Sequence, residues 1–125
     1  MTTFDLESTY LGLDRLGRVT PLPVGPTFWQ TIGQHPAAQE TLVTVGTGNG
    51  DWNHWEMHPH GDEILVTLEG SARMIFQTVG GEESFDLSPG KTLVVPSGVW
   101  HRAQMQKKLR MMFITYGRDT KHKPL

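Results

Sequence analysis

The sequence predicts an all-β fold closed into a sandwich or a barrel. Apolar stretches of about five to eight residues alternate with Gly, Pro, Asn and Asp, as in antiparallel strands joined by short turns. Helical periodicity is nearly absent. A single open sheet of many short strands would leave an apolar face and two edges in water, so we expect the sheet to close.

The chain of 125 residues, 37% of them apolar, is long enough for one core and too short for two ordinary domains. We therefore expect one domain in three parts. Residues 1–40 are predicted to form an irregular, proline-rich arm that packs on the barrel, with short strands near Val19 and over 28–32. The barrel is predicted over 41–118, and a C-terminal tail over 119–125.

Within the barrel, runs rich in β-branched and aromatic residues are predicted to be strands. The turns between them contain residues that tolerate turn conformations, at 46–51, 69–70, 80–81 and 88–90. Gly80-Gly81, between two extended runs, predicts a hairpin. The predicted strands are 41–45, 53–58, 64–68, 72–78, 84–87, 92–95, 102–106 and 110–116.

Composition excludes several classes of function. A formal charge of −2 offers no basic surface to neutralise phosphates, so nucleic acid is not an expected partner. The absence of cysteine excludes a disulfide framework and thiolate ligands. The N-terminus lacks a basic region followed by an apolar run, and no apolar run reaches about eighteen residues, so we expect a cytoplasmic protein that does not enter membranes.

Two short segments, 56–63 and 96–101, contain imidazoles and carboxylates that together suffice for one metal ion. Glu56 and His58 lie two apart in a predicted strand and so point to the same face. Glu63 precedes an apolar strand, where a carboxylate costs several kcal/mol unless a cation or hydrogen-bond donors satisfy it. His101 follows a Pro-Ser-Gly turn. Nitrogen and oxygen donors without thiols suit Fe, Mn, Ni or Zn.

These segments resemble the two motifs of the small single-domain cupins. The first cupin motif, G-x5-H-x-H-x3-4-E-x6-G, matches Gly50, Glu56-Met57-His58, Glu63 and Gly70. The second, G-x5-P-x-G-x2-H-x3-N, matches Gly90, Pro96-Ser97-Gly98 and His101. The resemblance implies the RmlC-like cupin superfamily and its fold, a double-stranded β-helix or jelly-roll barrel.

The first motif departs from the family at its leading histidine, which is Glu56 here. An alternative register pairs His58 with His60, but only two residues then remain before Glu63, fewer than the family's spacing. For Glu56 the alternative role is an ordinary solvent-facing acid. The second motif ends in Met105 instead of Asn. The favoured ligand set is Glu56, His58, Glu63 and His101, with His60 as the alternative ligand.

Other side chains are candidates for the surroundings of the site. His54 and His60 are expected at the rim of the site or beside its ligands, and His35 and His122 at the surface. Small-molecule sites are lined by apolar rings with a few polar groups. The candidates for such a pocket are Trp52, Arg73, Trp100 and Gln104.

The resemblance implies a metal-binding cupin that binds or transforms a small oxygen-rich organic molecule, with dioxygenase- or isomerase-like chemistry at one divalent ion. The alternative is a non-catalytic small-ligand carrier or sensor, with or without metal. A metal-free epimerase is disfavoured, because its acid and base would be a His and Tyr pair, whereas the histidines here have the spacing of metal ligands. Small cupin barrels are more often dimers than monomers, so we expect a homodimer, with the segment 21–26 packing across the two-fold axis.

Overall fold

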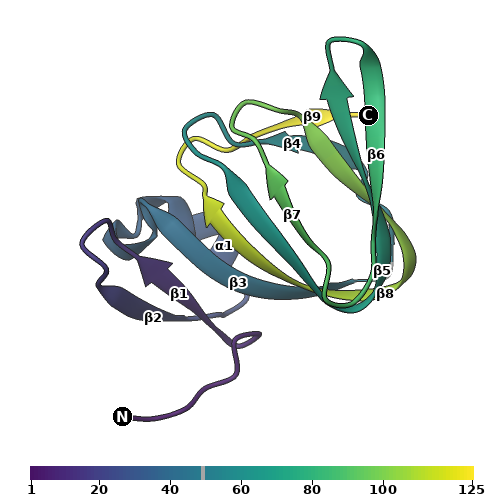
Figure 1. The fold of residues 1–125 in the computed structure, drawn as a ribbon. Helices are drawn as coiled ribbons and strands as arrows, with labels where there is room; N and C mark the ends of the chain where they lie inside the picture. Colours follow the sequence, from purple (N-terminus) through teal and green to yellow (C-terminus); the bar gives the residue numbers. More distant parts are fainter. Residues whose placement is uncertain (49) are drawn as a thin grey trace.

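The computed structural model describes residues 1–48 and 50–125, and the backbone alone at 106 and 107. The described residues form a nine-stranded antiparallel sheet that curves into a barrel (Figure 1), which confirms the predicted all-β class. The predicted turn over 46–51 includes Asn49, which lies outside the described residues. The strands are β1 (Thr9–Leu13), β2 (Val19–Pro23), β3 (Thr41–Gly48), β4 (His54–Met57), β5 (Glu63–Thr78), β6 (Gly81–Leu87), β7 (Thr92–Val95), β8 (His101–Tyr116) and β9 (Lys121–Pro124).

The two longest strands, β5 and β8, each join two strands that the sequence predicted separately. They pair from Glu63↔Thr115 to Phe76↔His101, with irregular register between Thr67 and Ala72. Over this bend β5 changes partner from β7 to β6, so one strand serves both halves of the curved sheet. Gly70 lies at the bend with φ 77°, and a Cβ there would be 1.8 Å from the carbonyl oxygen of Lys108. β5 therefore bends where a turn was predicted, at 69–70.

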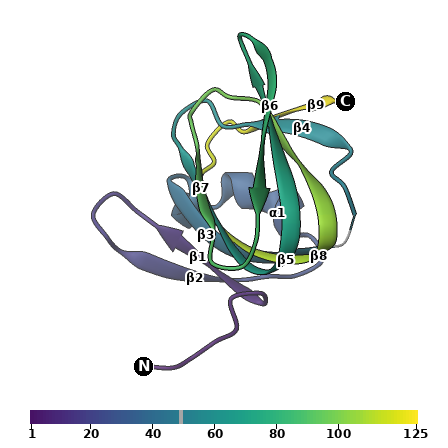
Figure 2. The ribbon, with the colours of Figure 1, turned by 45° about the vertical axis from the view of Figure 1, so that its right-hand side comes forward.

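The N-terminal arm is more regular than predicted. β1 and β2 form a hairpin that extends beyond one side of the barrel (Figure 2), and β1 pairs with β3 of the same chain. The predicted strand over 28–32 is wrong, because helix α1 (Phe28–Thr31) occupies this position, followed by 3-10 turns at Ile32–Gln34 and Pro36–Ala38. A spacing of four places Phe28 and Ile32 on one side of a helical turn, where both pack in a small cluster with Tyr10 and Leu22.

The C-terminal residues, predicted as a plain tail, contain β9. It pairs with β4 in the register Trp55↔Lys123 and Glu56↔His122. The charged sequence of β9 has no apolar alternation, so its strand conformation depends on its neighbours. Lys123 Nζ lies 4.4 Å from the centroid of the Trp100 ring and donates to Gln77 Oε1 at 2.8 Å.

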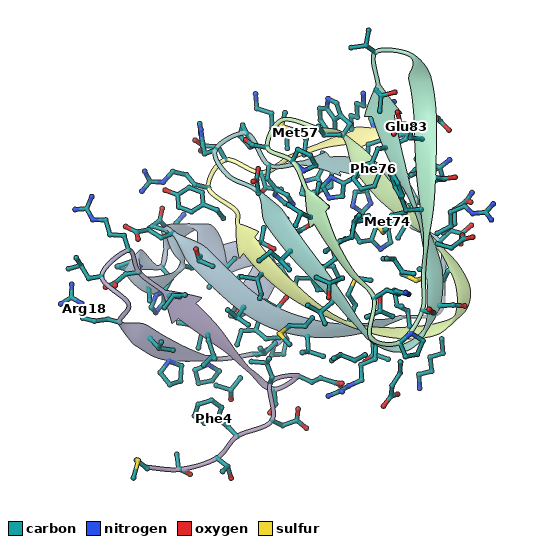
Figure 3. All side chains as sticks on the ribbon, viewed as in Figure 1. Phe4, Arg18, Met57, Met74, Phe76 and Glu83 are labelled. Carbon is teal, nitrogen blue, oxygen red and sulfur yellow. The ribbon has the colours of Figure 1, made fainter. Side chains whose placement is uncertain are left out.

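The main core lies inside the barrel. The side chains of Met74 and Phe76 on β5 lie within the curved sheet, whereas Glu83 lies on the β5–β6 hairpin (Figure 3). The buried cluster consists of Leu65, Ala72, Met74, Phe76, Leu87, Val95, Ala103, Leu109 and Met111.

Within the described residues no helix is long and apolar enough to cross a membrane.

Candidate metal centre

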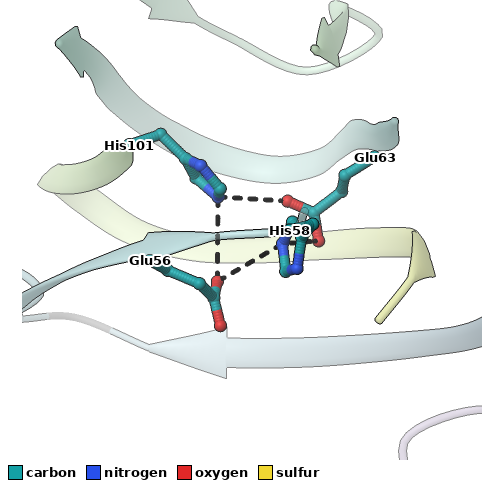
Figure 4. A group of neighbouring side chains, drawn as sticks. All are labelled: Glu56, His58, Glu63 and His101. Atoms are coloured by element: carbon teal, nitrogen blue, oxygen red, sulfur yellow. Dashed lines mark ion pairs between the residues drawn. The ribbon is translucent and has the colours of Figure 1, made fainter. Parts of the chain in front are cut away.

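Four side chains from three strands and one loop converge inside the barrel (Figure 4). Each offers one nitrogen or oxygen atom, and these four atoms lie within 4.8 Å of one another. His58, Glu63 and His101 are buried, and the Glu56 side chain is 20% exposed. The group consists of Glu56, His58, Glu63 and His101, the set favoured from the sequence.

Strand register explains why these residues meet. On β4, Glu56 lies opposite His101 of β8 on one side and His122 of β9 on the other. Residues directly opposite in an antiparallel pair project to the same face, so all three side chains point the same way. Glu63 opens β5 in phase with the buried Leu65, which turns its carboxylate inward.

The two motif segments are bound to each other by hydrogen bonds. The Gly98 amide donates to the His58 carbonyl at 2.9 Å, and the Ser97 amide donates to Asp62 Oδ1 at 2.8 Å. The Ser97 hydroxyl donates to the Pro59 carbonyl at 3.0 Å. Gly98 has φ 81°, a conformation that favours glycine. These bonds hold the loop bearing His58 against the turn that leads into His101.

Hydrogen bonds at Nδ1 fix both histidines with Nε2 toward the centre. The Thr120 hydroxyl donates its proton to the Gly117 carbonyl at 2.7 Å, so it accepts from His58 Nδ1–H at 2.8 Å. His101 Nδ1 lies 3.1 Å from the Val99 carbonyl, which can only accept, so Nδ1 carries the proton there too. With Nδ1 protonated, neutral forms of His58 and His101 present an Nε2 lone pair, as a metal ligand requires.

The Glu63 carboxylate lies between the two imidazoles. Its Oε2 is 3.3 Å from His58 Nε2 and accepts from the Thr115 hydroxyl at 2.5 Å, and its Oε1 is 3.4 Å from His101 Nε2. Burial raises the pKa of Glu63, but the close contacts with the imidazoles of His101 and His58 and the hydrogen bond from Thr115 outweigh burial and lower the pKa to about 2. Glu63 is therefore ionised at neutral pH. Burial lowers the pKa of His101, but contact with Glu63 outweighs burial, so the pKa is raised overall.

Three buried atoms of the centre have no well-directed hydrogen-bond partner: His58 Nε2, His101 Nε2 and Glu63 Oε1. The separations of 3.3 and 3.4 Å bring them close, but the contacts do not have the geometry of hydrogen bonds. Unpaired polar atoms are costly inside a protein, and one divalent cation would satisfy all three. The donor set of two imidazoles and two carboxylates thus fits a mid-row divalent ion.

The remaining candidates lie elsewhere, apart from Trp52. His60 Nε2 is 2.9 Å from Asp119 Oδ2, outside the group of four. Arg73, expected as a pocket residue, is exposed and pairs with Asp86 at 2.8 Å, and Gln104 lies opposite it on the same face. Strand register could not be read from the sequence, which is why these outward positions remained candidates for the pocket. Trp100, also a pocket candidate, instead lies beneath the Lys123 ammonium group.

Sequence reasoning missed three side chains of the site. His122, expected as a plain surface residue, is half exposed, yet its Nε2 lies 3.1 Å from Glu56 Oε1. Thr115 and Thr120 hold Glu63 and His58. Thr115 could have been noticed in the sequence, because it is a polar residue in the apolar run that forms the end of β8. No sequence pattern marks Thr120 or His122, since the pairing of β4 with β9 brings them to the site.

The centre opens into a cavity of ≈ 640 Å³ between the barrel and the arm. Trp52 belongs to its wall, with its ring stacked on that of His54 at 5.8 Å between centroids. The arm, β3 and β8 supply a largely apolar part of the wall. The lining includes Tyr10, Trp29, Ile32, Ala38, Leu42 and Phe113, together with His54, Glu56, His58, Glu63 and His122.

Comparison with known proteins agrees with this architecture. The sequence model of the Cupin domain family matches residues 35–115. The uncharacterized protein YdbB of Bacillus subtilis (strain 168) is 34% identical over 62 residues, which are 50% of this chain and 50% of that protein. The chain thus spans about half the length of this curated relative.

Solved structures share the fold at low sequence identity. A cupin-2 domain containing protein from Shewanella frigidimarina superposes with a TM-score of 0.54 at 22% identity, covering 62% of this chain and 71% of that one. A mutant of Bacillus subtilis oxalate decarboxylase OxdC gives a TM-score of 0.58 at 20% identity, covering 70% and 24%. At these identities the likeness concerns the fold alone.

Proposed function

This chain belongs to the cupin domain family, and from that premise we propose that it is a metal-binding cupin that binds or transforms a small oxygen-rich organic molecule. The observation that carries the proposal is the set of three buried, unpartnered atoms on His58, His101 and Glu63, which face one point. Buried polar atoms without hydrogen-bond partners are costly inside a protein, and a cation held between these three atoms would remove that cost.

The proposed cofactor is one divalent ion, Fe, Mn, Ni or Zn, held by Glu56, His58, Glu63 and His101. His60 is the weaker candidate for a ligand, since it pairs with Asp119 away from the group. When bound, such an ion would supply a Lewis acid for substrate oxygens and, in the case of iron, redox chemistry with dioxygen. The favoured reactions are accordingly of the dioxygenase or isomerase type.

The surrounding residues prepare the site for such chemistry. Thr120 and the Val99 carbonyl orient the imidazoles, and Thr115 orients Glu63. Glu56 directs Oε2 toward the centre, 3.7 Å from His101 Nε2, and directs Oε1 toward His122. His122 is half exposed and lines the cavity, so it can hold a proton at Glu56 Oε1 or pass it to solvent.

The first test is elemental analysis of protein purified without added metal or chelator, and again after reconstitution with each of the four metals. We expect close to one equivalent of metal, lost in Glu56→Ala and His101→Ala. His60→Ala is the matched control, because it removes an imidazole outside the group and should keep the metal. Retention of metal in His101→Ala, or its absence from every reconstituted sample, would contradict the proposal.

Turnover is tested separately. Metal-loaded protein is mixed with candidate substrates in air while oxygen consumption and product formation are followed. An enzyme consumes substrate, whereas a carrier or sensor binds it and shifts its melting temperature without consuming anything. Binding without turnover would select the non-catalytic alternative at the same metal centre.

A further inference from the structure

The lining of the cavity beside the candidate metal centre combines two kinds of side chain. Glu56, His58 and Glu63 of the centre contribute its polar part, and apolar side chains of the arm, β3 and β8 contribute its apolar part, called the apolar end below. The cavity volume of ≈ 640 Å³ falls in the range of sites for small organic molecules. This volume is far larger than two or three coordinating atoms require. The apolar end is formed by Tyr10, Trp29, Ile32, Ala38, Leu42 and Phe113.

Trp29 is the most exposed large side chain of this apolar end. It is 64% exposed, although its ring packs against Phe28 at 5.1 Å and Tyr10 at 5.8 Å between centroids. These contacts hold the ring in place, and the ring lines the cavity. An aromatic ring held in this way offers an apolar surface to a ligand at little cost in side-chain entropy.

The charges of the polar part limit the head of the ligand. Among the described residues that line the cavity there is no Lys or Arg, and the acidic side chains are Glu56 and Glu63. A divalent ion held by both carboxylates would be neutralised by them. A doubly charged ligand such as a dicarboxylate would therefore leave two negative charges uncompensated in a largely apolar cavity.

We propose that the ligand of this site is a molecule with an uncharged or singly charged pair of oxygen donors joined to an apolar, ring-sized body. The oxygen donors face the centre, and the body packs against Trp29 and the other apolar residues of the wall. This inference rests on the proposed function, because it takes the metal centre as the anchor of the oxygen donors. The proposed ligand class distinguishes this site from a site that binds small dianions such as oxalate.

The test compares three chelating probes by titration calorimetry on protein whose metal content has been measured. Benzohydroxamic and acetohydroxamic acid share one uncharged head and differ in the apolar body, and oxalate is the dianion. We expect benzohydroxamic acid to bind on the order of tenfold to a hundredfold more tightly than acetohydroxamic acid, the gain expected for burying a phenyl group. Oxalate should bind more weakly than benzohydroxamic acid.

Variants assign this gain to the cavity wall. Trp29→Ala should lose most of the preference for benzohydroxamic acid, and Trp29→Phe should keep most of it. Leu16→Ala is the matched control, because Leu16 is an exposed apolar residue of the arm outside the cavity lining. Binding to acetohydroxamic acid, which lacks the ring, should be the same in all three variants.

The outcomes separate the two proposals. Protein that holds metal but binds the two hydroxamic acids equally, or binds oxalate most tightly, overturns the ligand class and leaves the metal centre standing. An unchanged preference in Trp29→Ala overturns the role of the arm. Protein that retains no metal after reconstitution overturns both proposals.

Discussion

The pairing of Glu63 with two buried histidines predicts how stability depends on pH and on metal. The folded pKa of Glu63, about 2, lies below its ordinary value of 4.5. Its contribution to the free energy of unfolding is therefore complete above pH 4.5 and is lost as the pH falls through about 2. His101 has a raised pKa, so its contribution is complete below 6.5 and is lost as the pH rises through that raised value.

The opposite pH dependences of the Glu63 and His101 contributions define a pH interval in which both are complete. Without metal, Glu63 and His101 are both fully charged between pH 4.5 and 6.5, so the centre should stabilise the fold most in this interval. A pKa of about 2 in place of 4.5 corresponds to a contribution of about 3 kcal/mol. A bound metal ion needs neutral imidazoles, so stabilisation by metal should instead grow as the pH rises above this interval.

The assay is urea denaturation of metal-free protein at several pH values, for the wild type and for Glu63→Gln. The difference in unfolding free energy between the two should shrink by about 3 kcal/mol as the pH falls from 4.5 to about 2. Glu83→Gln is the control, since Glu83 is exposed on β6 and should show no comparable change. A difference that stays constant over this range would refute the reasoning, because Glu63 would then be unaffected by the histidines.

Three further predictions concern other parts of the molecule. Thr120→Val removes the acceptor of His58 Nδ1, so metal affinity measured by titration should fall about 10- to 100-fold, whereas Thr78→Val, at an exposed hairpin hydroxyl, should leave it unchanged. Equal affinity of the two variants would rule out a positioning role for Thr120. Gly70→Ala should lower the free energy of unfolding in urea by more than the ~1 kcal/mol of the left-handed conformation alone, because of the clash with the Lys108 carbonyl; Gly80→Ala, with open space around it, should cost little, and similar losses at both positions would be inconsistent with this account. Light scattering should give about twice the chain mass of 14.0 kDa if the expected homodimer forms, and a value near 14.0 kDa would reject it.

Much of the fold could be predicted because a strand buried on one face has an alternating pattern. The strand at Val19 and most of the barrel strands followed from this pattern and from turn residues. The bends of β5 and β8 did not, because Gly70 gives the same local signal for a turn and for a bulge within a strand. Helix α1 has one turn, too short for a helical period to be recognised in the sequence.

The candidate site, like the fold, could be predicted from the sequence only in part. Glu56 and His58 could be paired because their spacing matches the period of a strand, and Glu63 was conspicuous before an apolar run. His122 enters the site through a register between strands that no local sequence pattern encodes. Arg73 was misplaced for a related reason, since a shift of one residue in register moves a side chain to the other face.

The pairing of β4 with β9 also bears on how the protein folds. Two hydrogen bonds that complete the centre join residues 62 and 66 positions apart, His58 with Thr120 and Glu56 with His122. Chain entropy must be lost before contacts this distant in sequence can form, and β proteins with such topology fold over milliseconds to seconds. We expect the barrel to reach most of its structure first and the centre to form in a late step, so that metal captures a nearly native chain and does not nucleate it.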